Sequence, residues 1–202
     1  EKFKQISRWG DINRAFEGIE EAKRVGFKSI KLNAVIQRGI NDGEVEDLLQ
    51  FAASNGLILR LIELMPIGPA CDQKNLYIPL SEIKQRLQKK YSLFVSGVCV
   101  GSGPAVYYKI AELKTLIGFI SPVSQPFCKD CNRIRISSDG RFQDCLAYDG
   151  TFSFRELLRD PAFTDEMIAR ETVSLLQGKR ESHNNFTQTI SEKTPCMYGI
   201  GG

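Results

Sequence analysis

The feature that most constrains the fold is a strand, helix and strand pattern in residues 28–65. KSIKLNAVI (residues 28–36) and LILRLIELM (residues 57–65) are rich in branched apolar residues, which is typical of strands. Between them, NDGEVEDLLQFAASNG is acidic at its start and ends in Asn-Gly, which indicates a capped helix. Two strands joined by a helix in so short a segment predict a right-handed parallel βαβ unit.

An amphipathic helix is predicted just before this unit, in residues 11–25. Apolar residues recur there at helical spacing, Asp11 is a candidate N-cap and Gly26 a candidate stop. Because a helix precedes the first strand, we expect another strand upstream of Glu1. The sequence therefore predicts an α/β protein that begins in the middle of a larger α/β layer or barrel.

The alternation of strands and helices stops at residue 68. PLSEIKQRLQKKY (residues 79–91) predicts a helix, and AVYYKI (105–110) and LIGFIS (116–121) predict two strands. SFRELLRD (153–160) predicts a short helix with a capping box of Ser153 and Glu156, and another helix is expected from Thr164 to Gln177. Residues 177–202 are polar and indicate an extended tail.

Charge and hydropathy exclude two classes of protein. The chain has 27 basic and 24 acidic residues, and a net charge of +3 is too small to indicate a nucleic-acid surface. No apolar run approaches the roughly 20 residues that span a bilayer, and the first residues lack the apolar stretch of a signal peptide. We expect a cytoplasmic protein without nucleic-acid or membrane partners.

Six cysteines in a chain without an export signal favour metal or redox chemistry over disulfides. Three of them form the pattern C-x2-C-x13-C at Cys128, Cys131 and Cys145. The other three are scattered singly, at Cys71, Cys99 and Cys196. We interpret Cys71 and Cys99 as small apolar residues of the interior.

The third cysteine of this pattern ends a predicted β-hairpin, RIRISSDGRFQDC (residues 133–145). A type I turn with Gly140 in the left-handed bulge position would pair Gln143 with Arg135 and Cys145 with Arg133. Cross-strand partners share a face, so Cys145 and both arginines would project together beside the other two cysteines. A two-residue Asp-Gly turn would instead move Cys145 to the face of Ile134.

Three thiolates are one ligand short of a closed tetrahedral site. His183 or Cys196 would complete a structural zinc site, whereas a [4Fe-4S] cluster on three cysteines leaves one iron open to a ligand. Arg133 and Arg135 suit bidentate binding of phosphate or carboxylate. A structural zinc site does not require such arginines. The residues alone leave both metals open.

Ligands of open α/β sheets gather at the carboxyl ends of the strands. Alternation along the two predicted strands makes Lys31 and Arg60 candidates for side chains that point into such a site. The alternative is that Lys31 lies on a solvated face or pairs with Glu63 on the neighbouring strand.

FCKDCNRIRISSDGRFQDCL (residues 127–146) resembles the C-terminal cluster motif of the MoaA-type GTP 3′,8-cyclases of molybdenum cofactor biosynthesis, which are radical S-adenosylmethionine (SAM) enzymes. IKLNAVIQRGIND, LRLIELMPIG, IGFISPVSQPFC and the terminal YGIGG agree in order and spacing. The resemblance implies that residues 1–68 are the last βα units of an incomplete (βα)6 barrel. It implies that residues 69–202 are a C-terminal iron–sulfur and GTP-binding α+β region, whose Gly201-Gly202 tail reaches the active site.

This family rearranges GTP into a cyclic pterin precursor, beginning with abstraction of a ribose hydrogen by a 5′-deoxyadenosyl radical. The resemblance implies a [4Fe-4S] cluster, open to the guanine base, on Cys128, Cys131 and Cys145. Arg133 and Arg135 are the implied catalytic residues. The residues implied to bind GTP or SAM are Lys31, Arg60, Met65, Arg133, Ile134 and Arg135. Implied partners are GTP and a downstream cyclic pterin synthase, and a homodimer is compatible with the family.

One departure from the family is large. Its members hold a second [4Fe-4S] cluster, which binds and cleaves SAM, on an N-terminal C-x3-C-x2-C motif, and no cysteine precedes Cys71 in this sequence. We expect that the chain is the C-terminal portion of such an enzyme and is inactive alone. The alternative is a non-catalytic module, either stabilised by zinc or binding a nucleotide without turnover.

Overall fold

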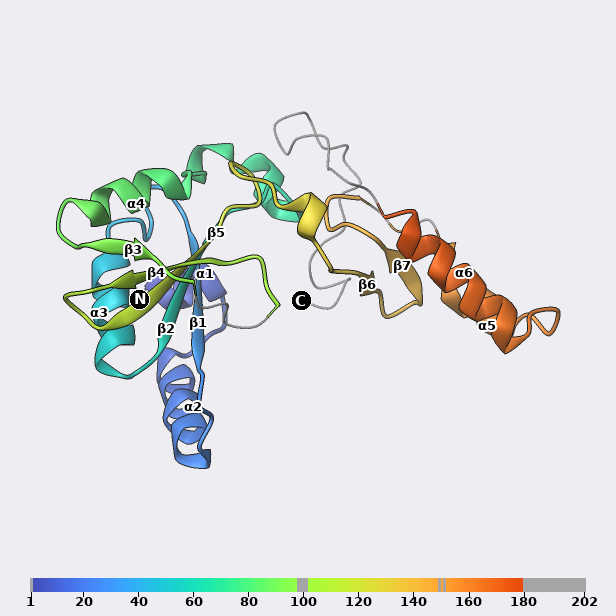
Figure 1. Cartoon of the computed structure of the whole chain (residues 1–202), viewed down its shortest axis with the longest axis horizontal. Coiled ribbons are helices and arrows are strands. Elements are labelled where there is room, and N and C mark those ends of the chain that lie inside the picture. The colour runs from blue at the N-terminus through green and yellow to red at the C-terminus, as the bar shows by residue number, and fades with distance from the viewer. Residues whose placement is uncertain (1, 98–101, 149, 151, 180–202) are drawn as a thin grey trace. The chain divides into compact units, whose positions relative to one another are not determined.

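The computed structural model describes residues 2–97, 102–148, 150 and 152–179 (Figure 1). These residues form two compact units. The first unit consists of Glu1–Leu64 and Leu76–Ser121, and the second of Met65–Asn75 and Pro122–Gly202.

The first unit is built on a five-stranded mixed sheet in the order β1-β2-β5-β4-β3 (Figure 1). Its strands are β1 Lys31–Ile36, β2 Ile58–Glu63, β3 Leu93–Val95, β4 Val106–Ile110 and β5 Thr115–Ile120. Strands β1, β2 and β5 are parallel, whereas β3 and β4 pair antiparallel. The predicted α/β class and its parallel strands are thus confirmed.

Four α-helices belong to this unit: α1 Lys2–Ser7, α2 Ile12–Val25, α3 Val45–Ser54 and α4 Leu80–Gln88. Asp11 caps α2 as predicted, because its side chain accepts a hydrogen bond of 2.9 Å from the Asn13 N–H. Gly26 ends α2 in the left-handed conformation, with φ 92°, which costs a glycine little. Two 3-10 helices, η1 Gly68–Asp72 and η2 Lys74–Leu76, precede α4.

The core of the first unit lies on one face of the sheet. Leu59, Leu61 and Ile117 point to this face and are 0% exposed, and they pack with side chains of α3 and α4 such as Leu49 and Ile83. Burial of such aliphatic side chains contributes about 1.5–3 kcal/mol each relative to exposure. The opposite face is only partly covered, and Val35 on it is 43% exposed.

The second unit contains a three-stranded sheet in the order β6-β7-β8 and two α-helices. Its elements are the 3-10 helix η3 Cys128–Asp130, the strands β6 Arg135–Ile136, β7 Arg141–Gln143 and β8 Phe152–Ser153, and the helices α5 Phe154–Arg159 and α6 Asp165–Gln177. Ser153 caps α5 as predicted, accepting a 3.3 Å hydrogen bond from the Glu156 N–H. Thr164 caps α6 in the same way.

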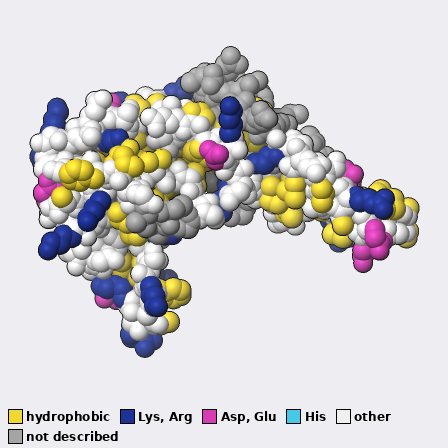
Figure 2. Space-filling view, in the orientation of Figure 1, with side chains coloured by type: hydrophobic (Ala, Val, Ile, Leu, Met, Phe, Trp, Pro, Cys, Tyr) yellow, Lys and Arg dark blue, Asp and Glu magenta, His cyan; other side chains and the backbone are white. Residues whose placement is uncertain are grey.

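The β6–β7 hairpin has the predicted register. Arg135 pairs with Gln143, and the Ser137 N–H donates to the Arg141 carbonyl over 2.9 Å. Gly140 occupies the turn at φ 84°, and a Cβ there would come within 2.8 Å of Arg155 Cβ. This register excludes the two-residue turn that would have moved Cys145 to the face of Ile134. Figure 2 shows hydrophobic side chains on the surface over this hairpin, where Ile134 is 41% and Ile136 is 56% exposed.

The division into units differs from the boundary expected at residue 68. Residues 106–120 form β4 and β5, and β5 completes the parallel sheet beside β2, so this segment packs with the first unit. No described helix is long and apolar enough to cross a membrane. Cys99, His183, Cys196 and the Gly201-Gly202 tail lie outside the described residues.

Candidate functional site

Two of the three motif cysteines are held by one tight turn. Cys128 begins η3, and the Cys131 N–H donates to the Cys128 carbonyl over 3.1 Å. A 3-10 turn brings residues three positions apart to the same side of the chain, so both thiols emerge together. Both cysteines are free thiols and are partly exposed.

Cys145 lies beyond the end of β7 and is also a partly buried free thiol. Burial raises its pKa, and the charges of Asp144 and Cys128 raise it further, while the Ala147 N–H and Lys179 lower it. Among the described residues, no set of three or more His, Cys, Asp or Glu side chains is gathered closely enough to hold a metal ion.

The donor set nevertheless fits an iron–sulfur group in its chemistry. Three cysteines in the second unit supply soft thiolate ligands, and thiolates select iron–sulfur clusters and zinc over hard cations. Three aspartates, Asp130, Asp139 and Asp144, lie in the same segment, so the preference for a soft metal rests on the cysteine thiolates alone. The ligand set of Cys128, Cys131 and Cys145 remains a prediction that rests on the chemistry and spacing of the three thiols.

Arg135 and its neighbour Gln143 face each other across the hairpin. Gln143 is 4% exposed, and its side-chain N–H donates to the Tyr148 carbonyl over 2.7 Å. Its Oε1 atom is buried without a hydrogen-bond partner among the residues that the structure describes. An unpaired buried carbonyl costs about 1–3 kcal/mol, so this oxygen marks a place where a hydrogen-bond donor would be stabilised. Sequence reasoning placed Gln143 in the register but assigned it no role.

Arg133 lies two residues before Arg135, where the strands of the hairpin separate. Its backbone carbonyl accepts a 2.8 Å hydrogen bond from the Lys179 ammonium. Its side chain is exposed, whereas Arg135 is half-buried. Because side chains alternate along a strand, Arg135 points to one side of β6 and Ile136 to the other. No sequence signal pointed to Lys179, because one lysine after a helix is an ordinary feature.

Met65 lies in the second unit with the cysteines. It packs against the small apolar cluster of Ile67 and Leu146, together with Ala147. Leu146 and Ala147 directly follow Cys145 in the sequence, so the structure brings Met65 to the segment that carries the third cysteine. The resemblance implied that Met65 lines the SAM site. The packing of the Met65 side chain holds the backbone of this residue next to Ile67.

Lys31 and Arg60 lie in the first unit, on the partly covered face of the sheet. Arg60 pairs in register with Asn33, and its Nε donates to Asn33 Oδ1 over 2.8 Å. Gly118 occupies the next position in this row, and a Cβ there would come within 3.1 Å of Arg60 Cγ. Glycine at this position therefore leaves room for the arginine stem.

Lys31 begins β1 on the same face as Asn33. Glu63 points to the other face, is 1% exposed, and accepts a 3.1 Å hydrogen bond from the Leu80 N–H at the start of α4. The register pairs Lys31 with Ile58 and Glu63 with Ile36, at opposite ends of the strand pair. The alternative in which Lys31 pairs with Glu63 across the strands is therefore not what the structure shows.

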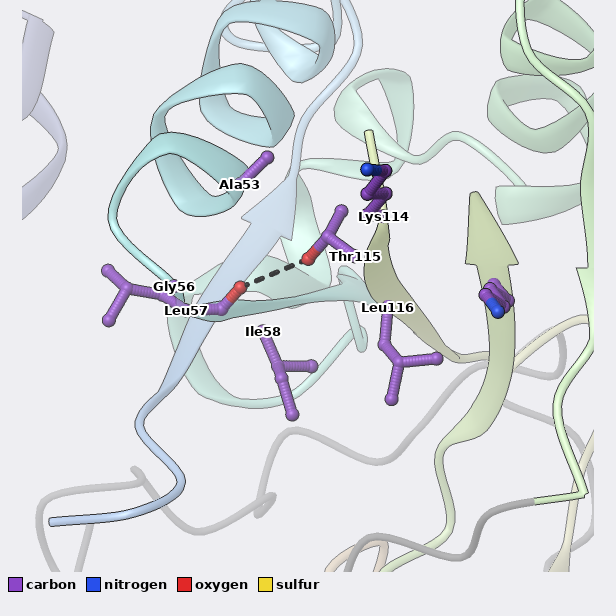
Figure 3. Close-up of a pocket in the computed structure, with 8 residues that line it drawn as sticks. Ala53, Gly56, Leu57, Ile58, Lys114, Thr115 and Leu116 are labelled. Carbon is purple, nitrogen blue, oxygen red and sulfur yellow. Dashed lines mark hydrogen bonds between the residues drawn. The ribbon is translucent and has the colours of Figure 1, made fainter. Parts of the chain in front are cut away.

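Figure 3 shows a pocket in the first unit, and Ile58, one of the residues that line it, is the register partner of Lys31. It is lined by residues of α3, β2, β4 and β5 and of the turns before β2 and β5: Ala53, Gly56, Leu57, Ile58, Lys109, Lys114, Thr115 and Leu116. Across it, the Thr115 hydroxyl donates to the Leu57 carbonyl over 3.4 Å. Ile58 and Thr115 begin β2 and β5, so the pocket lies at the amino ends of the parallel strands, opposite the edge where such sheets bind ligands.

Comparison with known proteins decides the family. Residues 57–185 match the family model described as Molybdenum Cofactor Synthesis C. The chain belongs to this family. The resemblance read from the cysteine motif and the segments around it is thereby confirmed.

Curated relatives of this Molybdenum Cofactor Synthesis C chain are named GTP 3′,8-cyclase. One from Rhizobium etli strain CIAT 652 is 41% identical over 198 residues, which are 98% of this chain and 56% of the relative. One from Thermodesulfovibrio yellowstonii is 39% identical over 85% of this chain and 53% of the relative. One from Moorella thermoacetica is 36% identical over 100% of this chain and 62% of the relative. The chain thus spans little more than half the length of these relatives.

Proposed function

We propose that this chain is the C-terminal part of a radical SAM GTP 3′,8-cyclase, which converts GTP to a cyclic pterin precursor in molybdenum cofactor biosynthesis. The relatives' name supplies the activity and the substrate. The single observation that supports the proposal is the hairpin register, which pairs Arg135, two residues after Arg133, with Gln143, two residues before Cys145. We further propose that β1, β2 and β5 are the last strands of an incomplete (βα)6 barrel.

Cys128, Cys131 and Cys145 would hold a [4Fe-4S] cluster, which supplies an iron with an open coordination position for a ligand atom of the substrate. Arg133 and Arg135 would bind GTP through charge-assisted hydrogen bonds, which are shorter and stronger than neutral ones. The backbone around Ile134 would contact the nucleotide between them. The free Oε1 of Gln143 beside Arg135 would accept a hydrogen bond from one of these donors.

Residues of the first unit and of the segment LMPIG (residues 64–68) have proposed ligands as well. Lys31 would reach the phosphates of GTP, and Arg60 and the backbone of Met65 would contact SAM. The hydrogen bond from Arg60 to Asn33 fixes the arginine stem along the sheet, which favours a positioning role for it. The division of function between residues 1–68 and 69–202 is part of this proposal, as are a homodimer and a cyclic pterin synthase as the downstream partner.

SAM cleavage would require the N-terminal C-x3-C-x2-C motif, which this sequence lacks. We therefore expect that the 202-residue chain, reduced with dithionite, forms no 5′-deoxyadenosine from SAM. Formation of this product by the purified chain would overturn that part of the proposal.

Metal analysis of the anaerobically purified chain tests the proposal as a whole. We expect brown protein with about four iron and about four acid-labile sulfide per chain. Replacing Cys145 by Ser should remove most of the iron, because two thiolates are left to hold the cluster. Cys71→Ser is the matched control, since the Cys71 thiol is also partly buried but donates to the Pro66 carbonyl over 3.1 Å. Colourless protein with one zinc would instead establish the non-catalytic module.

A further inference from the structure

Lys179 joins the two strands of the β6–β7 hairpin at its open end. The last pair of the ladder is Arg135 and Gln143, and beyond it the strands separate toward the cysteines. The Lys179 ammonium donates to the Arg133 carbonyl over 2.8 Å and also to the Asp144 carbonyl. One ammonium thus bridges a carbonyl from each strand directly beside Cys145.

The backbone around Cys145 is held from both sides. Before it, Lys179 binds the Asp144 carbonyl; after it, the Gln143 side chain donates to the Tyr148 carbonyl over 2.7 Å. The Tyr148 N–H also donates to the Cys145 carbonyl over 3.3 Å. These contacts span the turn that carries the thiol, so the position of Cys145 depends on Lys179 and Gln143 more than on regular strand pairing.

Lysine suits this place for two reasons. An ammonium carries three donors and no acceptor, so it can donate to both carbonyls at once. Its long, flexible side chain also lets the ammonium reach both carbonyls from beyond the end of α6. Lys179 follows α6 directly, so the contact ties the end of that helix to the cysteine loop.

We propose that Lys179 is a positioning residue that closes the open end of the β6–β7 hairpin and so presents Cys145 and Arg133 to the bound metal group. The proposal rests on the proposed function only in assuming that the three cysteines bind metal, and it holds for zinc as well as for an iron–sulfur cluster. Lys179 itself touches backbone carbonyls, not substrate.

The test compares Lys179→Met, Lys179→Gln and Lys179→Arg in the anaerobically purified chain. The readouts are the rate at which a chelator removes the bound metal and the absorption spectrum of the metal group. Loss of a charge-assisted bridge should speed metal release about tenfold in the Met variant. The Gln variant should resemble it, since one neutral amide is too short to bridge both carbonyls. The Arg variant should approach the parent rate, because a guanidinium offers several donors.

The control is Lys109→Met, at an exposed lysine of β4 in the first unit, which should change neither readout. A parent rate in the Lys179→Gln variant, or equal losses in the Gln and Arg variants, would overturn the proposal even if the Met variant does not fold. Zinc instead of iron in the parent chain would contradict the proposed function and leave the comparison of release rates intact. The two failures are therefore distinguishable.

Discussion

Different interactions stabilise the interior of each of the two units. In the first unit a contiguous core joins one face of the sheet to α3 and α4, and Ile36, Leu49 and Leu59 in it are 0% exposed. In the second unit the corresponding cluster is built on Ile67 and Leu146, which are 5% and 9% exposed. Phe142 adds edge contacts with Phe154 at a centroid distance of 5.8 Å.

This difference in core size indicates which interactions stabilise each unit. The stabilisation from apolar burial grows with the size of the core. A small core seldom stabilises a fold unless a metal or a disulfide adds to it. The second unit contains tethers of another kind, namely the Lys179 bridge, the Gln143 contact and the caps of α5 and α6. We infer that its cysteine loop depends on a bound metal group, whereas the first unit does not.

The largest effect is expected from a cavity in the core of the first unit. Leu59→Ala removes a fully buried side chain between the sheet and its helices, so it should lower the free energy of unfolding by about 2–5 kcal/mol. The matched control is Ile136→Ala in the second unit, where the side chain is 56% exposed and little should be lost. Urea unfolding followed by circular dichroism measures both. Comparable losses would mean that the two units do not differ as described.

A smaller effect is expected on nucleotide affinity in the second unit. Arg133→Lys and Arg135→Lys keep the charge but lose the planar fork, so each should weaken GTP binding to the metal-loaded protein by about tenfold. Arg141→Lys is the control on the same hairpin, because the Arg141 guanidinium is engaged by Asp139 at 2.9 Å. Calorimetric titration of GTP gives the affinities. Unchanged affinity in both test variants would place the nucleotide elsewhere.

The smallest effect concerns surface charges of the first unit. Arg38 and then Arg86 donate to Glu82 and lower its pKa from the ordinary 4.5 to about 2. A carboxyl with a lowered pKa stabilises the fold fully above pH 4.5, and this contribution is lost as pH falls toward about 2. Glu82→Gln should therefore melt slightly below the parent at neutral pH, and the difference should shrink across that range. Melting curves with a constant difference from pH 7 down to pH 2 would exclude this role.

Local patterns predicted the fold well where neighbours in sequence decide the structure. Asp11 and Gly26 bound α2, and the Ser-Ser-Asp-Gly turn set the register of Arg135 against Gln143, because a turn fixes its own strands. The parallel pairing of β5 with β2 joins residues far apart in sequence, so no local pattern contained it. The short strand β3 was missed for the same reason: Leu93–Val95 is a strand only because β4 pairs with it.

The same distinction between local and distant contacts applies to the candidate site. The cysteine spacing is read directly from the sequence, and the pairing of Arg135 with Gln143 followed from the turn chemistry of a short segment. Lys179 could not be found in this way, because its two contacts reach the Arg133 and Asp144 carbonyls from beyond the end of α6. Met65 was found through the family resemblance, and its packing against Leu146 became visible in the structure alone.

Hydrogen exchange of the chain before and after removal of its bound metal tests the central claim most directly. The hairpin amides of Ser137 and Phe142 in the second unit should lose protection when the metal is removed, because tethers and thiolates hold that unit. The strand amides of Leu61 and Ile117 in the first unit should keep theirs, because an apolar core holds them. Equal protection of both units in the two states would contradict the account.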